Sequence, residues 1–251
     1  MNISLAAEPL FHLGTFPLTN TLIMAVFVSI ALLAVSLLAR RSFSVGGSLV
    51  PVGVGNAIEA VVEGLLDLVD SVTNDRKKSS RFLPIIATIF LFVIVSNWIE
   101  LVPGLGTVGI WEEHGGKSIL VPFIRSASAD LNVTLAIALF SVVITQVVGI
   151  REVGAKLHLK KFFNFTGPIM FFVGLLELVS EFAKIISFSF RLFGNIFAGE
   201  VLLIVVTTLA PYILPLPFLL LEIFVGFVQA LVFSMLTLVN LNMATQHHAA
   251  H

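Results

Sequence analysis

The sequence predicts an all-α integral membrane protein. Hydrophobic residues make up 57% of the 251 positions, charged residues make up 12%, and phenylalanine alone occurs 23 times. The mean hydropathy is +1.05, whereas a soluble domain carries about 25% charged residues. Because so few polar side chains cannot coat a water-soluble globule, lipid must be much of the solvent.

The same composition excludes several classes of function. The net charge of −1 gives no reason to expect a nucleic-acid partner, and the absence of cysteine excludes disulfides and thiolate metal sites. The three histidines near the C-terminus fit a frayed tail better than a metal site, so we expect no metal and no cofactor. Residues 1–17 lack the basic region of a signal peptide, so they are expected to form an external tail before a retained span.

The first 150 residues predict three membrane spans and one surface helix. The spans cover residues 18–39, 82–102 and 131–150, and about 20 apolar residues cross a hydrocarbon core of ~30 Å. Residues 51–74 differ because polar side chains recur every three or four positions, at Asn56, Glu59, Glu63, Asp67, Asp70 and Asn74. This spacing predicts an amphipathic surface helix. Its acidic face favours contact with a partner or with the other spans, and a solvated helix is the alternative.

Two longer apolar stretches follow, at residues 166–209 and 212–243. As one helix the first would be about 66 Å long, more than twice the hydrocarbon thickness. It therefore forms either one steeply tilted helix or two spans that break near Gly194. No proline interrupts residues 169–210, which favours a single helix paired with the second stretch. The stretches are split at Ala210-Pro211-Tyr212, and the nearby Pro215 and Pro217 favour a turn in this connection.

Basic residues in the loops predict the orientation of a single membrane domain. Ten of the fourteen lysines and arginines fall at residues 40–81 and 151–161, and only Lys117 and Arg125 fall in the opposite loop at 103–129. Because short cytoplasmic loops are enriched in basic residues, the N-terminus is expected outside and the tail at 244–251 in the cytoplasm.

Arg191 is the most informative residue, because it lies inside the stretch at 166–209. A guanidinium at the bilayer centre costs about 2.5–3.5 kcal/mol on insertion scales, and it cannot lose its proton. Helical spacing puts Ser187 and Asn195 on the face of Arg191 and Glu200 on the opposite face. Glu177 returns to the Arg191 face more than two turns nearer the cytoplasm. A purely structural ion pair between Arg191 and Glu177 or another carboxylate is an alternative.

The last stretch carries a polar stripe. Glu222 and Gln229 are seven residues apart and share one helical face, with Asn240 near it. Together with Glu200 they are able to line a narrow aqueous path. The alternative is an interhelical hydrogen bond that only holds the two helices together, which contributes about 0.6–2 kcal/mol in membranes.

These residues carry a resemblance to a known family. Residues 189–200 (SFRLFGNIFAGE) resemble the signature of subunit a of bacterial rotary (F-type) ATP synthases. Residues 229–237 (QALVFSMLT) are similar to the last helix of that family, and residues 130–134 (DLNVT) are similar to the start of an earlier span. The resemblance runs from the first span to Asn242, and the overall layout resembles alphaproteobacterial members.

The resemblance implies a stator beside a ring of c subunits, each with a mid-membrane carboxyl group. Other implied partners are the peripheral stalk b and b′ subunits, further ATP synthase subunits, membrane lipid and the transported proton, in the bacterial inner membrane. It implies no catalytic chemistry in this chain. The motif positions imply that Arg191 is the essential stator charge. They also imply an outside half-channel and a cytoplasmic half-channel, the first with Asn195, Glu200, Glu222, Gln229, Asp130 and Asn132, the second with Glu177 and Ser187.

Two other classes of function remain from the residues themselves. A self-contained proton channel or antiporter needs a titratable carboxyl beside Arg191 within this chain, and Glu177 is its candidate. A structural membrane anchor fits poorly with the polar stripe of Glu200, Glu222 and Gln229.

Overall fold

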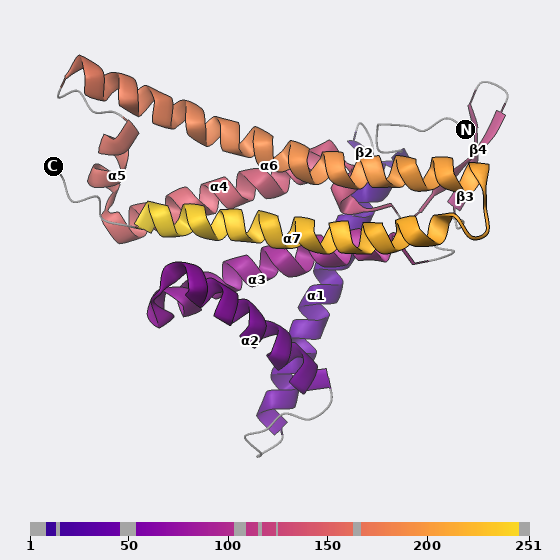
Figure 1. Cartoon of the computed structure of the whole chain (residues 1–251), viewed down its shortest axis with the longest axis horizontal. Coiled ribbons are helices and arrows are strands. Elements are labelled where there is room, and N and C mark those ends of the chain that lie inside the picture. Colours follow the sequence, from indigo (N-terminus) through magenta and orange to yellow (C-terminus); the bar gives the residue numbers. More distant parts are fainter. Residues whose placement is uncertain are drawn as a thin grey trace.

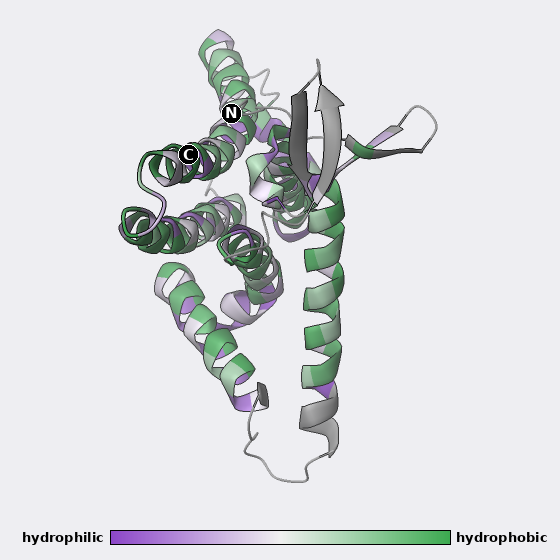
Figure 2. Ribbon diagram, turned by 90° about the vertical axis from the view of Figure 1, so that its right-hand side faces the viewer, coloured by the Kyte–Doolittle hydropathy of each residue, from purple (hydrophilic) through white to green (hydrophobic). Residues whose placement is uncertain are grey.

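The computed structural model describes residues 9–13, 16–45, 54–102, 109–114, 117–123, 125–162 and 167–245. Within these ranges five helices are long and apolar enough to cross a membrane, which confirms the predicted all-α membrane class. Figure 2 shows the apolar character that most of these helices share. The terminal histidines and residues 1–8 of the predicted external tail lie outside the described residues. The five helices are α1 (Asn20–Val45), α3 (Arg76–Ile99), α4 (Leu131–Val153), α6 (Pro168–Leu209) and α7 (Pro215–Thr245).

Four of the long helices form one bundle. Helices α3, α4, α6 and α7 run side by side, and α1 crosses them steeply (Figure 1). The closest packing joins α3 to α7 and α4 to both α6 and α7. Buried side chains from each helix meet in one core, including Val93, Ala138, Leu192 and Phe233. Because successive helices alternate in direction, the ends of α3 and α6 lie beside the starts of α4 and α7.

Local sequence explains where these helices begin and end. The Asp75 and Asp130 carboxylates each accept a hydrogen bond from a backbone N–H in the first turn of α3 and α4, as N-cap residues do. Gly154 follows α4 with a φ of 94°, a conformation that glycine adopts without steric cost. Pro168 is the first residue of α6, where its missing N–H costs no hydrogen bond.

Helix α6 runs for 42 residues without a break. At ~1.5 Å per residue it is about 63 Å long, so it must tilt strongly to remain within a hydrocarbon core of ~30 Å. The turn between α6 and α7 occupies residues 210–214. Helix α7 begins at Pro215, because proline is tolerated in the first turn of a helix, where backbone N–H groups lack intrahelical partners.

The amphipathic helix α2 spans Val54–Thr73. It buries Leu65 and Val69 and packs against α1, α3 and α7, whereas Glu59 and Glu63 stay exposed. At its C-terminal end the Asp70 carboxylate pairs with Arg76. Hydrogen bonds from the Ser79 side chain and from Arg76 hold the pKa of Asp70 below its ordinary value. The membrane spans therefore cover the part of the apolar face of α2 that carries Leu65 and Val69, whereas Val61 and Leu68 stay exposed.

Smaller elements were not predicted. Strands β1 (Pro9–Leu13) and β2 (Phe16–Thr19) form one antiparallel hairpin, and β3 (Gly109–His114) and β4 (Lys117–Pro122) form another within the predicted external loop. Both hairpins lie near the end of the bundle where α7 begins (Figure 1). The Gly115-Gly116 pair between β3 and β4 is a sequence signal for such a hairpin. Two short helices complete the chain, η2 (Ala127–Ala129) and α5 (Ala155–Phe162).

Candidate functional site

Arg191 lies near the middle of α6 on the face that points away from the bundle. Its neighbours Phe188, Leu192 and Ile196 are buried in or beside the core, whereas Arg191 itself is exposed. Its Nη2 donates a hydrogen bond to Ser187 Oγ at 3.3 Å, and its guanidinium lies 6.0 Å from the centre of the Phe188 ring. In the described part of the chain no carboxylate lies within ion-pair distance of Arg191. The helix therefore presents a permanent cation to whatever lies outside this chain.

Glu200 lies on the inward side of the same helix, as the helical spacing predicts. Its Oε2 accepts hydrogen bonds from Arg125 Nη2 at 3.0 Å and Arg125 Nε at 3.3 Å. Arg125 precedes η2 and is only 5% exposed. The sequence analysis counted Arg125 as a loop charge and missed this contact. Its position just before the 130–134 motif was the available signal. Helix α6 thus carries a fixed cation on one side and an interior carboxylate on the other.

Glu222 enters the same region from α7. Its side chain is buried, and its carboxyl group packs against the backbone of Gly199, where a Cβ atom would overlap it. Glu200 and Glu222 line a cavity of about 260 Å³ between the ends of α3 and α6 and the start of α7. The cavity is large enough to hold several water molecules, each of which occupies about 30 Å³ in the liquid. Two carboxyl groups from different helices therefore share one hydratable space.

Asn195 and Gln229 connect α6 and α7 closer to the bundle centre. Asn195 Nδ2 donates to Gln229 Oε1 at 2.8 Å, and Gln229 is 4% exposed. The Nε2 atom of Gln229 is buried without a hydrogen-bond partner among the described residues. Since a buried amide N–H is costly to leave unpaired, this donor is available to a neighbouring acceptor or to water.

The Asn195–Gln229 contact predicts an energetic coupling between α6 and α7. Replacing both residues with alanine should reveal a coupling free energy of about 0.6–2 kcal/mol, the range for interhelical hydrogen bonds in membranes. A double-mutant cycle on the unfolding of the purified chain in mixed micelles measures it. The control is the same cycle with Asn195 and Thr245, which lies at the far end of α7. The changes in unfolding free energy of these two distant substitutions should be additive. Additivity for Asn195 and Gln229 as well would contradict this prediction.

Glu100 is a further carboxyl group at this cavity, and the sequence analysis assigned it no role. It lies one residue beyond α3, lines the same cavity as Glu200 and Glu222, and accepts a hydrogen bond from the Ser126 backbone N–H at 3.1 Å. Burial raises the pKa of Glu100 above its ordinary value, and the neighbouring Glu200 carboxylate raises it further. No spacing rule links residue 100 to residues 200 and 222, so only the folded chain reveals this cluster.

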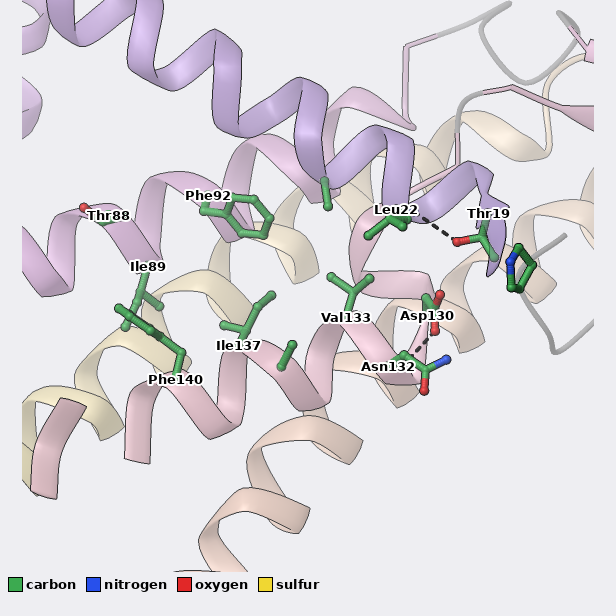
Figure 3. Close-up of a pocket in the computed structure, with 13 residues that line it drawn as sticks. Thr19, Leu22, Thr88, Ile89, Phe92, Asp130, Asn132, Val133, Ile137 and Phe140 are labelled. Carbon is green, nitrogen blue, oxygen red and sulfur yellow. Dashed lines mark hydrogen bonds between the residues drawn. The ribbon is translucent and has the colours of Figure 1, made fainter. Parts of the chain in front are cut away.

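Asp130 and Asn132 lie beside a different cavity. Asp130 Oδ2 accepts a hydrogen bond from Thr21 Oγ1 at 2.8 Å, and its other oxygen caps α4. Both residues are at the polar end of a largely apolar cavity of about 610 Å³ between α1, α3 and α4, where Ile137 and Phe140 line the deeper part (Figure 3). The structure therefore separates these two residues from the cavity shared by Glu200 and Glu222.

The two polar residues predicted on the cytoplasmic side also lie apart from each other. Ser187 accepts a hydrogen bond from Arg191, whereas Glu177 Oε1 pairs with Lys161 Nζ of α5 at 2.6 Å. Lys184 Nζ, on the same helix, pairs with Glu181 Oε1 at 2.8 Å. The carboxylate that a self-contained channel would need beside Arg191 is thus bound to a different cation.

Comparisons with known proteins show the family to which this chain belongs. Residues 21–242 match the family model described as ATP synthase A chain. Proteins named ATP synthase subunit a are similar over most of their length. The one from Moorella thermoacetica is 30% identical over 91% of this chain and 92% of its own. The one from Campylobacter jejuni subsp. jejuni (strain 81-176) is 35% identical over 89% of each chain, and the one from Campylobacter fetus subsp. fetus is 35% identical over 94% and 93%. The chain therefore belongs to the ATP synthase A chain family.

Proposed function

We propose that this chain is the stator of the proton path in the membrane sector of a bacterial ATP synthase. In this role it provides two laterally offset half-channels and the fixed charge of Arg191, and it couples proton movement to rotation of a c-ring. The peripheral stalk b and b′ subunits and surrounding lipid are the other partners. The chain performs no covalent chemistry itself.

The observation that carries the proposal is the orientation of Arg191. Its guanidinium is exposed on α6 within a candidate membrane span. A charge in lipid is costly, and such residues usually face a partner, a cavity or a counter-charge. No described carboxylate pairs with it, which supports a counter-charge supplied from outside the chain. A mid-membrane carboxyl group on a neighbouring ring supplies that charge.

Arg191 would control the protonation of each passing ring carboxyl. A nearby cation favours the ionised form, so the proton leaves into one half-channel as the carboxyl approaches. After passing Arg191 the carboxylate takes a proton from the other half-channel, becomes neutral and can face lipid. The same cation repels a proton that would cross directly. The membrane potential supplies about 2.3 kcal/mol per charge per 100 mV to this cycle.

The outside half-channel would use the interior side of α6 and α7. Glu200 and Glu222 share the cavity of about 260 Å³, and the pair of Asn195 and Gln229 would continue the path toward the ring. Asp130 and Asn132, which line the separate cavity of about 610 Å³, would lie near the entry. Because Glu200 and Arg191 occupy opposite sides of α6, protons that reach Glu200 are kept apart from the cation until they reach the ring.

The cytoplasmic half-channel would run along the outward face of α6 past Ser187 and Glu177. The basic residues at the start of α3, at the end of α4 and in α5 support this orientation. They include Arg76, Lys77, Lys78, Arg81, Arg151, Lys156, Lys160 and Lys161. The positive-inside tendency favours this end on the cytoplasmic side of the bacterial inner membrane and the N-terminus outside.

Proton flux in liposomes tests this proposal against a self-contained proton channel or antiporter. The isolated chain should conduct few protons, because each half-channel reaches only part-way across the membrane. The chain assembled with its ring should translocate protons when ATP is hydrolysed. A pH-sensitive dye inside the liposomes reports both fluxes. Sustained conduction by the isolated chain, unaffected by adding the ring, would reject the stator and favour the channel.

A further inference from the structure

Helices α3 and α4 leave a groove between them at the end of the bundle where α3 begins. Both helices pack against α7, and among the described residues they barely contact each other. A cavity of about 330 Å³ lies between the start of α3 and the last turns of α4. Its lining combines five apolar side chains with three charged ones, which are Arg81, Arg151 and Glu152. A ligand that fits this cavity therefore needs an apolar part and a charged part.

The charged side chains leave an excess of positive charge at this cavity. Arg81 of α3 forms an ion pair with Glu152 of α4, whereas the exposed Arg151 makes no ion pair with the described residues. Exposed ion pairs between long side chains contribute little to stability, so the Arg81 guanidinium can also bind a second anion. Guanidinium groups bind phosphate oxygens through two parallel hydrogen bonds. The charged part of the ligand is therefore an anion, and a phosphate group matches the two arginines.

The apolar part of the groove runs from these charges into the membrane spans. Ile85 lies four residues beyond Arg81 on α3, and Ile144 lies seven residues before Arg151 on α4. At ~1.5 Å per residue this lining extends about 6–10 Å from the charged end. One turn deeper, Phe140 of α4 lines the apolar part of the cavity of about 610 Å³ (Figure 3). The two spaces therefore follow the path of an acyl chain that enters from the charged end.

The charged end also lies where anionic headgroups are found. Basic residues gather at the start of α3, at the end of α4 and in α5. Anionic lipids give the cytoplasmic leaflet a negative surface potential, and basic pockets between membrane helices on that side bind their headgroups. No residue of the proposed proton path lines the cavity of about 330 Å³, so this site is independent of the stator role.

We propose that the groove between α3 and α4 binds one anionic phospholipid. Its phosphate lies on Arg81 and Arg151, and one acyl chain runs along Phe82, Ile85 and Val148. The lipid supplies the packing that α3 and α4 do not give each other. A zwitterionic lipid carries a cation beside its phosphate, so the two arginines favour the anionic one. An apolar protein helix in the groove would leave the charge of Arg151 without a counter-charge.

Photolabelling of the assembled ATP synthase in lipid nanodiscs tests this proposal. The probe is phosphatidylglycerol with a photoactivatable group in one acyl chain, and mass spectrometry locates the labelled peptides. In the unaltered complex the label should attach to residues 82–88 and 137–148. Arg151→Gln should lower this labelling about fivefold, the factor that one basic residue contributes to anionic lipid binding. Adding Arg81→Gln should lower it further. Phosphatidylcholine with the same labelled chain should react about fivefold less than phosphatidylglycerol.

Matched controls separate the site from a general charge effect. Arg151→Gln breaks no ion pair with the described residues, so its result does not depend on the contact between Arg81 and Glu152. Lys156→Gln with Lys160→Gln removes two charges from exposed positions of α5 and should leave the labelling unchanged. Labelling elsewhere on the chain is the internal standard for every sample.

Three results would overturn the proposal. Equal labelling by the two lipids would show a groove that does not select the anionic headgroup. Unchanged labelling in both arginine variants would show that the guanidinium groups do not hold the phosphate. A groove without label beside normal labelling elsewhere would show that a protein helix covers it in the assembled complex.

Discussion

Arg191→Ala is expected to abolish ATP-driven proton pumping by the assembled complex. Without the guanidinium nothing at the exposed face of α6 favours the ionised form of a passing ring carboxyl. Removing one preorganised electrostatic group typically lowers a rate by about 10²–10³-fold, and here no other described cation lies beside that position. Pumping into inverted membrane vesicles, followed by quenching of a pH-sensitive dye, measures the loss.

A second measurement distinguishes this role from a structural one. Because the cation also repels protons that would cross directly, Arg191→Ala should raise the passive proton leak through vesicles that contain the intact complex. Arg191→Lys should restore little pumping, since an ammonium on a flexible stem does not reproduce the planar guanidinium. Arg40→Ala, at an exposed position of α1, is the control and should pump normally. Full pumping by Arg191→Ala in assembled complexes would reject the assignment.

The sequence predicted the parts of the site that depend on helical periodicity. Arg191 and Glu200 are nine residues apart, so a regular helix directs them to opposite sides. In the structure Arg191 is exposed, and Glu200 accepts a hydrogen bond from the buried residue Arg125. Membrane spans are similarly predictable, because about 20 apolar residues in a row carry the whole signal. In such segments local sequence and spatial arrangement are directly related.

The remaining features depend on contacts between distant residues. Glu100 and Arg125 lie 100 and 75 positions from Glu200, outside any helical repeat that would link them to it. Only the packing of α3 against α7, and of η2 against α6, brings them to one cavity. The same holds for Asp130, which matches a motif of the family but bonds to Thr21 of α1.

Gly199→Ala is expected to lower coupled proton transport by about tenfold or more while the chain still folds. A Cβ atom at position 199 would overlap the Glu222 carboxyl group, which is the end of a flexible side chain and can move aside. Helix α6 therefore survives, and alanine even favours a helix over glycine by about 0.8–1 kcal/mol. The displaced carboxyl no longer sits beside Glu200 in the cavity, and a misplaced proton-transfer group loses much of its ~10²–10⁴-fold contribution. ATP-driven pumping per assembled complex measures the effect.

Shortening the opposing side chain should relieve the overlap. In the double variant Gly199→Ala with Glu222→Asp the carboxyl group withdraws by one methylene, so pumping should exceed that of Gly199→Ala alone. Such recovery is a non-additive coupling between two residues in contact. Gly64→Ala, at a helical position of α2 with no atom within 4 Å of the added carbon, controls for the change in helix propensity and should pump normally. Normal pumping by Gly199→Ala, or equal losses with and without Glu222→Asp, would show that proton transfer does not depend on where the Glu222 carboxyl lies against α6.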